Sequence, residues 1–279
     1  MVSPLCLDGY KRAVAEHFDG RTDYSRSEIH RRLADRLVRL ATPQRNERVL
    51  DVATGTGFVA IEVAHLVGEH GRVVGVDISP GMLAQAAKAV AAASLGNVEL
   101  VRADAEALDY PPASFDLVIC CNALPYMTNG AAALGHWHSL LRPGGRLAFN
   151  CWAEHSYATG HLLRTIAARH GIRVAAVGQD TETPEGCRSL LVAAGFVGPE
   201  VVVEATATFL SPDHLETFLD SAMSNPLYGI AMNEVRRLNE LRGEYLAEAR
   251  SSTVRKAINA ELGAYFALAH KLPELSPGW

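Results

Sequence analysis

The fold of this chain is decided by residues 48–63, which read Arg48-Val49-Leu50-Asp51-Val52-Ala53-Thr54-Gly55-Thr56-Gly57-Phe58-Val59-Ala60-Ile61-Glu62-Val63. Aliphatic and β-branched residues predict a short buried strand that ends on a carboxylate, and apolar residues at helical spacing follow a turn with two glycines. Gly55 and Gly57 lack the Cβ atoms that would keep a ligand off the backbone, and the next helix points free N–H groups at the same place. The stretch predicts a strand, loop and helix that bind a nucleotide-type cofactor.

Asp51 indicates which kind of cofactor the loop takes. A carboxylate this close to the turn would repel a pyrophosphate, whereas a cationic ligand would be attracted to it. The loop therefore favours a positively charged adenosine compound. S-adenosylmethionine (SAM), which carries a sulfonium and an ammonium group, has these properties.

Composition narrows the class of protein. The chain has 279 residues, of which 48% are hydrophobic and 20% charged, as expected for a globular protein with a substantial core. The formal net charge of -5 provides no general attraction to nucleic acid or to an anionic membrane. The five cysteines are scattered without metal-binding or disulfide spacing. No apolar run is long enough to span a bilayer, so we expect a cytoplasmic protein. We also expect a monomer or a homodimer.

Strands of continuous apolar character alternate with helices along the first half of the chain, which favours a parallel sheet covered on both faces. The prediction is an α/β, Rossmann-like, seven-stranded sheet with the last strand antiparallel. We expect the last two strands to pair as an edge hairpin. Polar residues end or closely follow four strands, where ligands bind in such sheets: Asp51, Asp77, Asp104 and Asn122.

We expect a single domain over residues 1–279. Within it, residues 1–41 are predicted to form an N-terminal helical lid and 42–210 the cofactor-binding core. Residues 211–262 read as helices broken at Asn225-Pro226 and at Gly243, and we expect them to cover the substrate. Residues 263–271 are expected to form the final edge strand.

Four motifs, taken in order and at their spacing, resemble those of class I SAM-dependent methyltransferases. They are the Asp51/Gly55/Gly57 loop, Asp77, Asp104-Ala105-Glu106 and Leu141-Arg142-Pro143-Gly144-Gly145-Arg146. The subgroup that they resemble is the ubiquinone/menaquinone-biosynthesis C-methyltransferase-like branch, which includes natural-product enzymes.

The resemblance implies a role for each cofactor residue. Gly55 and Gly57 would approach the methionine part of SAM, while the carbonyl of Ala53, with Asp51 behind it, would face the ammonium. Ala53 departs from the pattern, because the family usually has glycine there. Asp77 would accept from both ribose hydroxyls. The remaining predicted contacts, with adenine, the reactive methyl and the loop itself, are Ile78, Met82, Asp104, Ala105, Asn122 and Thr54.

Methyl transfer asks the protein mainly to place the nucleophile in line with the methyl group, exclude water and, where needed, accept a proton. The candidate catalytic residues are Tyr24, His30 and His155, in segments expected to border the methyl. Tyr126 and Trp152 are predicted to contact the substrate. No metal is predicted, because His136 and His138 are two apart on a helix and point away from each other.

Two alternatives stay open. Gly55-Thr56-Gly57-Phe58-Val59-Ala60 formally matches a dinucleotide loop of an NAD-dependent oxidoreductase. A SAM-binding scaffold or cyclase-like protein of the same fold would retain every cofactor motif. The acidic charge and the apolar residues of the predicted cover favour a small, partly apolar metabolite as methyl acceptor, with S-adenosylhomocysteine (SAH) as the second product.

Overall fold

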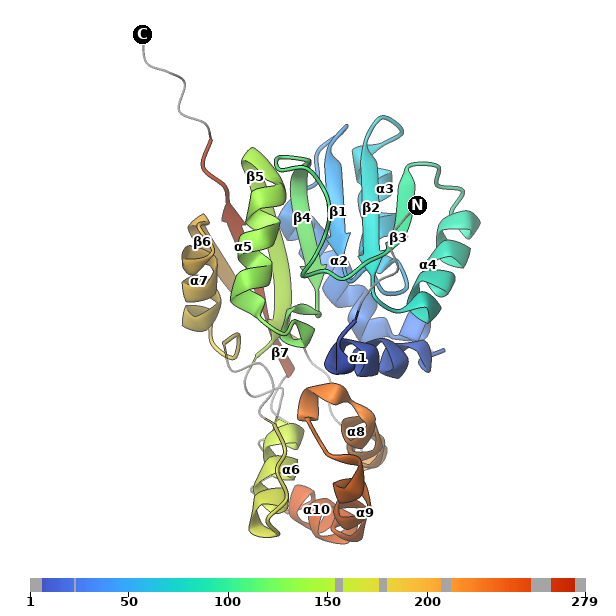
Figure 1. The fold of residues 1–279 in the computed structure, drawn as a ribbon, viewed down its shortest axis with the longest axis vertical. Helices are drawn as coiled ribbons and strands as arrows, with labels where there is room; N and C mark the ends of the chain where they lie inside the picture. Colours follow the sequence, from blue (N-terminus) through green and yellow to red (C-terminus); the bar gives the residue numbers. More distant parts are fainter. Residues whose placement is uncertain are drawn as a thin grey trace. The chain divides into compact units, whose positions relative to one another are not determined.

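The computed structural model describes residues 7–22, 24–153, 158–175, 180–206, 212–251 and 262–273. The chain divides into two compact units (Figure 1). Unit 1 comprises Met1–Asn150, Glu185–Val202 and Phe266–Trp279, and unit 2 comprises Cys151–Pro184 and Val203–Tyr265.

The strands form one seven-stranded sheet in the order β3-β2-β1-β4-β5-β7-β6. Parallel pairing joins β3 to β2, β2 to β1, β1 to β4 and β4 to β5. The strand order reverses direction between β1 and β4, and in open α/β sheets ligands bind at the carboxyl ends of the strands beside such a point. The strands are β1 (Arg48–Val52), β2 (Arg72–Asp77), β3 (Val98–Arg102), β4 (Phe115–Cys121), β5 (Leu141–Trp152), β6 (Val197–Thr206) and β7 (Leu262–His270).

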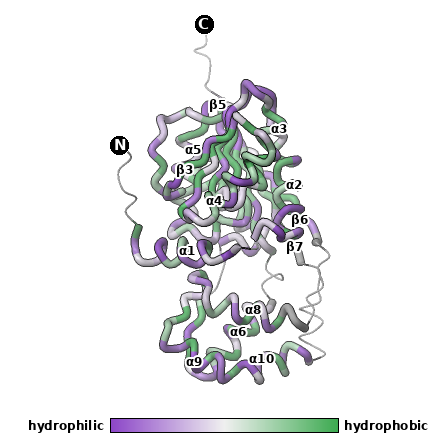
Figure 2. The backbone as a smooth tube through the Cα atoms, turned by 90° about the vertical axis from the view of Figure 1, so that its right-hand side faces the viewer, coloured by the Kyte–Doolittle hydropathy of each residue, from purple (hydrophilic) through white to green (hydrophobic). Residues whose placement is uncertain are grey.

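Continuous apolar sequence explains why β1 and β4 lie at the centre of the sheet. Val49, Leu50 and Val52 of β1 are fully buried, as are Leu117 and Val118 of β4. A strand buried on both faces must have helices on both sides. In Figure 2, hydrophobic segments of the chain, drawn in green, gather in the interior of unit 1.

Helices cover both faces of the sheet in unit 1. α3 packs against α2, β1 and β2, while α4 packs against β2 and β3. α5 lies on the other side of the sheet from α2 and α3 (Figure 1). The helices are α1 (Gly9–Asp19), α2 (Glu28–Ala41), α3 (Phe58–Val67), α4 (Pro80–Ala92), α5 (Gly130–Leu140) and α7 (Pro184–Ala193), with a short 3₁₀ turn, η1 (Tyr24–Arg26), before α2.

The position of the last strand differs from the prediction. β7 lies between β5 and β6, so β6 rather than residues 263–271 forms the edge. The hydrogen bonds of Lys271 with Gly144 and Gly145, and of Ala153 with Gly263, show that β7 runs antiparallel to β5. Burial explains the order, because consecutive residues 264–267 of β7 are buried whereas Val203 of β6 is 57% exposed.

Unit 2 is helical and has its own apolar core. Leu163 and Ile166 of α6 pack with Leu219 of α8 and Tyr245 of α10. Residues 158–175, expected within the cofactor-binding core, therefore fold with these helices. Gly243 does not break a helix; the break falls at Leu241. The helices are α6 (Ala158–Arg169), α8 (Pro212–Ser224), α9 (Met232–Glu240) and α10 (Arg242–Ala249), with a 3₁₀ turn, η4 (Pro226–Tyr228).

Among the described residues, no helix combines the length and the apolar character needed to cross a bilayer.

Candidate cofactor and substrate site

Residues 53–57 form the turn between β1 and α3, and three of them have left-handed backbone angles. The angle φ is +53° at Ala53, +56° at Gly55 and +88° at Gly57. The Thr54 N–H donates to the Val76 carbonyl, and the Gly57 N–H donates to the Thr54 carbonyl, both at 2.9 Å. Glycine adopts these angles without the clash that a Cβ introduces, whereas an alanine is strained there by about 1–2 kcal/mol. The turn conformation therefore explains why residues 55 and 57 are glycines. It also explains why glycine is usual in the family at the position where this chain has Ala53.

Asp51 lies near the carboxyl end of β1 and is almost fully buried. The Thr54 hydroxyl donates to Asp51 Oδ2 at 2.5 Å. Asp51 Oδ1 is buried and makes no hydrogen bond of normal geometry with the described residues. Burial raises the pKa of Asp51 to about 7; the Thr54 hydroxyl and the nearby Ala60 backbone N–H oppose the shift, and Asp77 adds to it. A buried carboxylate with an oxygen that lacks a well-formed hydrogen bond favours a cationic N–H donor nearby.

Asp77 ends β2 and holds the glycine loop through backbone hydrogen bonds. The Gly55 N–H donates to Asp77 Oδ2, and the Ser79 N–H donates to Oδ1, both at 2.8 Å. Burial raises the pKa of Asp77 to about 6, although these amides oppose the shift. Each carboxylate oxygen can accept a second hydrogen bond. Asp77 can therefore hold the loop and still accept from a pair of hydroxyls.

Asp104 follows β3 and is paired with a lysine from α1. Lys11 Nζ lies 2.6 Å from Asp104 Oδ2 and 2.9 Å from Glu106 Oε2. The Glu106 N–H donates to Asp104 Oδ1 at 3.0 Å. This arrangement joins α1 to the loop that follows β3.

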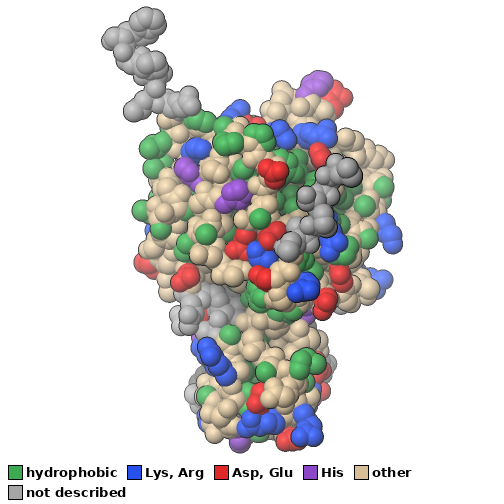
Figure 3. Space-filling model, in the orientation of Figure 1, with side chains coloured by type: hydrophobic (Ala, Val, Ile, Leu, Met, Phe, Trp, Pro, Cys, Tyr) green, Lys and Arg blue, Asp and Glu red, His purple; other side chains and the backbone are tan. Residues whose placement is uncertain are grey.

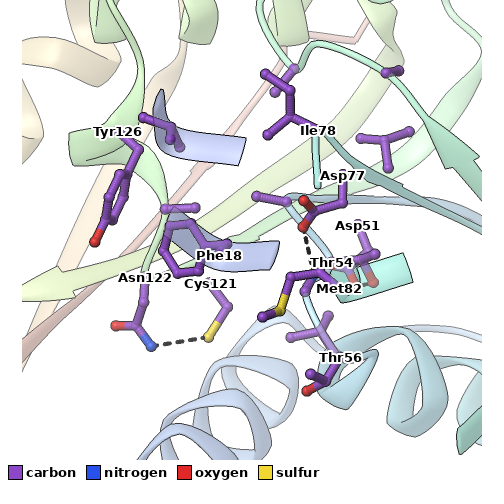
Figure 4. Close-up of a pocket in the computed structure, with 18 of the residues that line it drawn as sticks. Phe18, Asp51, Thr54, Thr56, Asp77, Ile78, Met82, Cys121, Asn122 and Tyr126 are labelled. Carbon is purple, nitrogen blue, oxygen red and sulfur yellow. Dashed lines mark hydrogen bonds between the residues drawn. The ribbon is translucent and has the colours of Figure 1, made fainter. Parts of the chain in front are cut away.

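Aromatic rings from the N-terminal segment and from the loop after β4 meet at one end of the cavity. The Phe18 ring lies 5.2 Å from that of Tyr126 and 6.3 Å from that of Tyr24, both edge-on. The Tyr24 and His30 rings lie 4.5 Å apart. In Figure 4, Phe18 and Tyr126 lie on the opposite side from Asp51 and Asp77. The cavity thus has a carboxylate end and an aromatic end.

His30 and Tyr24 present uncharged polar groups at the aromatic end. Ser27 occupies the N-cap position of α2, but its hydroxyl pairs with His30 Nδ1 at 2.5 Å and caps no N–H. Burial, together with the nearby charge of Arg21, lowers the pKa of His30 to about 4. Burial also raises the pKa of Tyr24 far above its usual value. Near neutral pH the imidazole is therefore unprotonated and the phenol is protonated.

Asn122 lines the cavity and is held in place by a second asparagine. The Asn122 N–H donates to Asn150 Oδ1 at 3.1 Å, and Asn150 Nδ2 donates to Asn122 Oδ1 at 2.7 Å. Asn122 itself has a φ of +56°. The buried Asn150 thus sets the orientation of Asn122.

One cavity of unit 1 brings together most of the predicted site residues (Figure 4). Gly57 does not line it; a Cβ there would meet Ala86 Cβ at an ordinary contact distance of 3.4 Å, so the φ of +88° and not lack of space favours glycine at this position. Trp152 belongs to unit 2 and does not line the cavity, and His155 lies outside the described residues. The predicted residues that line it are Tyr24, His30, Asp51, Ala53, Thr54, Gly55, Asp77, Ile78, Met82, Asp104, Ala105, Asn122 and Tyr126.

Several lining residues were not predicted. Lys11 and Phe18 lie on the α1 face that meets the cavity, but the sequence does not reveal which carboxylates Lys11 faces. Thr56 was not predicted, because it looks like an ordinary loop residue in the sequence. Its buried Oγ1 has no hydrogen-bond partner among the described residues. The others include Val14, Phe58, Glu106, Cys121 and Met127.

The charges of the cavity suit a cation. Its lining has four carboxylates, whereas Lys11 is the only lysine or arginine in that set of described residues and is already paired. A pyrophosphate would meet Asp51 and Asp77 without a free basic side chain to balance it. The unsatisfied Asp51 Oδ1 and the closely approachable backbone at Gly55 fit the ammonium end of SAM.

Metal ligands do not gather in the part of the chain that the structure describes: it holds no cluster of three or more His, Cys, Asp or Glu. His136 Nε2 lies 3.1 Å from the Leu108 carbonyl, and the His138 ring packs on Phe196.

Comparison with known proteins agrees with this geometry. Residues 49–145 match the family described as a methyltransferase domain. The chain is 36% identical over 143 residues to aklanonic acid methyltransferase DauC of Streptomyces sp. (strain C5), covering 50% of this chain and 65% of that protein. It is 36% identical over 140 residues to the ubiquinone/menaquinone biosynthesis C-methyltransferase UbiE of Teredinibacter turnerae, covering 50% of this chain and 56% of that protein. A solved structure from Bacillus halodurans C-125 shares the fold, with a TM-score of 0.57, 18% identity and coverage of 86% and 98% of the two chains.

Residues 49–145 therefore match a methyltransferase domain, and the cavity described above is built largely from them. The predicted likeness to the ubiquinone/menaquinone branch is confirmed for this region. The chain spans less than two thirds of the length of either curated relative.

Proposed function

We propose that this protein binds SAM in the cavity of unit 1 and transfers its methyl group to a small, partly apolar metabolite. The observation that carries the proposal is the buried Asp51, whose Oδ1 has no hydrogen bond of normal geometry with the described residues. An ammonium group would supply the missing donor and a compensating charge. Both SAM and SAH carry this ammonium, so both should bind.

The carboxylate end would hold the cofactor. Asp51, oriented by Thr54, and the Ala53 carbonyl would receive the ammonium, with the Gly55 backbone alongside. The second acceptor positions of Asp77 would receive the ribose hydroxyls.

The adenine would lie between two apolar side chains and a polar edge. Ile78 and Met82 would pack on the ring, and Asp104 would accept from its amino group while the Ala105 N–H donates. Asn122 would lie beneath the methyl group, held by its paired hydrogen bonds to Asn150.

The bound cofactor would supply a methyl group that its sulfonium already activates. The chain's own residues then have to hold the acceptor in line for an SN2 displacement and keep water out. The rings of Phe18, Tyr24 and Tyr126 offer an apolar surface for a partly apolar acceptor. His30, neutral near pH 7, can orient the acceptor through a hydrogen bond, whereas burial and Arg21 disfavour its taking up a proton. Trp152 and His155 stay predictions for the acceptor side.

Incubation with methyl-labelled SAM and a fractionated metabolite extract tests the proposal. We expect label in a small organic product with the wild-type protein and at least tenfold less with Asp51→Asn. Asp109→Asn, an exposed carboxylate outside the cavity, serves as the control. SAM binding without any methylated product would instead favour a scaffold or a cyclase-like protein.

A further inference from the structure

Glu106 connects three segments of unit 1. Its Oε2 lies 2.9 Å from Lys11 Nζ of α1 and accepts from the Thr128 N–H at 3.0 Å. Its Oε1 accepts from the Asn129 N–H at 2.9 Å. Asn129 is the N-cap of α5, where its side chain accepts from the Ala132 N–H at 3.0 Å. One carboxylate thus holds α1, the loop after β3 and the start of α5.

These groups are largely shielded from solvent. The side chain of Lys11 is 16% exposed, and those of Asp104 and Glu106 are each 12% exposed. Burial alone would raise the pKa of Glu106, but the hydrogen bonds from Lys11, Asn129 and Thr128 outweigh it and lower the pKa. Burial alone would lower the pKa of Lys11, but Asp104 and Glu106 raise it. Lys11 and Glu106 are therefore both charged at neutral pH. Figure 3 shows acidic and basic side chains next to each other on this face of unit 1.

The two ends of this network face different parts of the cavity. Asp104, which Lys11 contacts, lies at the proposed adenine end. Thr128 and Asn129 directly follow Tyr126 and Met127, which line the cavity at the aromatic end. We define residues 123–129 as the acceptor loop.

We propose that Lys11 and Glu106 are a positioning pair that couples adenine binding at Asp104 to the ordering of the acceptor loop. The pair touches no reacting atom. An adenine amino group that hydrogen-bonds Asp104 fixes that carboxylate, and through Lys11 it fixes α1 and Glu106. Glu106 then holds the Thr128 and Asn129 amides, so Tyr126 and Met127 take one position. This proposal rests on the proposed function, because it requires an adenine ligand at Asp104.

Glu106→Gln and Lys11→Met break the pair from its two sides. Gln keeps the shape of Glu106 but removes the charge, whereas Met keeps the length of Lys11 but leaves two carboxylates facing each other. Matched controls are Glu62→Gln on α3 and Lys88→Met on α4, both exposed and outside the cavity. All five proteins would be measured by hydrogen exchange with and without SAH, together with the Kd for SAH and the Tm.

In the wild type and both controls, we expect SAH to slow exchange in the glycine loop, residues 53–57, and in the acceptor loop. In Glu106→Gln and Lys11→Met, protection of the glycine loop by bound SAH should persist, while SAH-induced protection of residues 126–129 falls at least fivefold. A pair that merely stabilises the fold would lower the Tm and leave this ligand-induced difference intact.

Native SAH-induced protection of residues 126–129 in either variant would overturn the proposal. If Glu106→Gln does not fold, Lys11→Met decides alone, because it breaks the same connection at α1. Failure of SAH to bind the wild type would overturn the proposed function and this inference together. If SAH binds the wild type but does not change hydrogen exchange in the acceptor loop, only this inference is overturned.

Discussion

The Gly55 N–H donates to Asp77 Oδ2 over 2.8 Å, across 22 residues of sequence. This hydrogen bond joins the glycine loop after β1 to the carboxylate that ends β2. The ribose-binding group and the loop for the amino-acid end of the cofactor are therefore positioned together before any ligand arrives. Preorganisation of this kind reduces the entropy lost on binding.

Replacing Asp77 by Asn should weaken SAH binding at least tenfold and also lower stability. An amide has only one acceptor oxygen, so either the Gly55 or the Ser79 N–H loses its partner, at a cost of about 1–3 kcal/mol. Calorimetric titration with SAH and urea unfolding measure the two effects. An affinity within twofold of the wild type would show that Asp77 does not contact the ligand.

Asp51→Asn should reduce the affinity for SAH by about 10- to 100-fold, since a charge-assisted hydrogen bond contributes about 1.5–3 kcal/mol. Without ligand, the variant should be at least as stable as the wild type near pH 8, because a buried charge is removed. Asp109→Asn is the control and should change neither quantity. Loss of SAH binding together with a large loss of stability would point instead to a structural role for Asp51.

The raised pKa of Asp51 predicts opposite pH trends for folding and binding. An acid whose pKa rises on folding, here from 3.8 to about 7, binds its proton more tightly in the folded state. Its contribution to stability is therefore lost as pH rises between those values. Relative to Asp51→Asn, the ligand-free wild type should lose Tm from about pH 5 to pH 8, while its affinity for SAH should rise because the ionised carboxylate binds the ammonium. Thermal unfolding with and without SAH across this range measures both. A pH-independent difference between the two proteins would contradict the assignment.

Ala53→Gly tests the strain in the turn. At a φ of +53° the substitution removes a Cβ clash of about 1–2 kcal/mol, while the more flexible unfolded chain offsets about 0.5–1 kcal/mol. The free energy of unfolding should therefore stay equal or rise by up to about 1.5 kcal/mol, and SAH should still bind. The same change at Ala87, exposed in the middle of α4, should lower stability by about 1 kcal/mol. Urea unfolding compares the two, and equal destabilisation by both would contradict the strain at Ala53.

Local sequence pattern was sufficient to predict most of the strands and helices of unit 1. The strand, glycine turn and helix predicted within residues 48–63 correspond to β1, residues 53–57 and the first part of α3, because apolar periodicity and turn residues act over a few positions. The motif spacing also placed Asp51, Asp77 and Asp104 at one edge, since parallel strands bring their carboxyl ends together.

Contacts between segments that are distant in the sequence could not be predicted from local sequence pattern. Lys11 meets Asp104 across 93 residues, and Asn150 meets Asn122 across 28. No short-range signal distinguishes Lys11 from the exposed Arg12 beside it. The place of β7 between β5 and β6 likewise depends on which strand buries both of its faces, a property of the assembled sheet.

Calorimetric titration distinguishes a cavity that selects a cationic adenosine compound from one that takes a dinucleotide. SAM, SAH and NAD are titrated separately into the wild-type protein at one pH near 7.5. We expect saturable binding of SAM and SAH at one site per chain, with no measurable binding of NAD. Binding of NAD alone would contradict it.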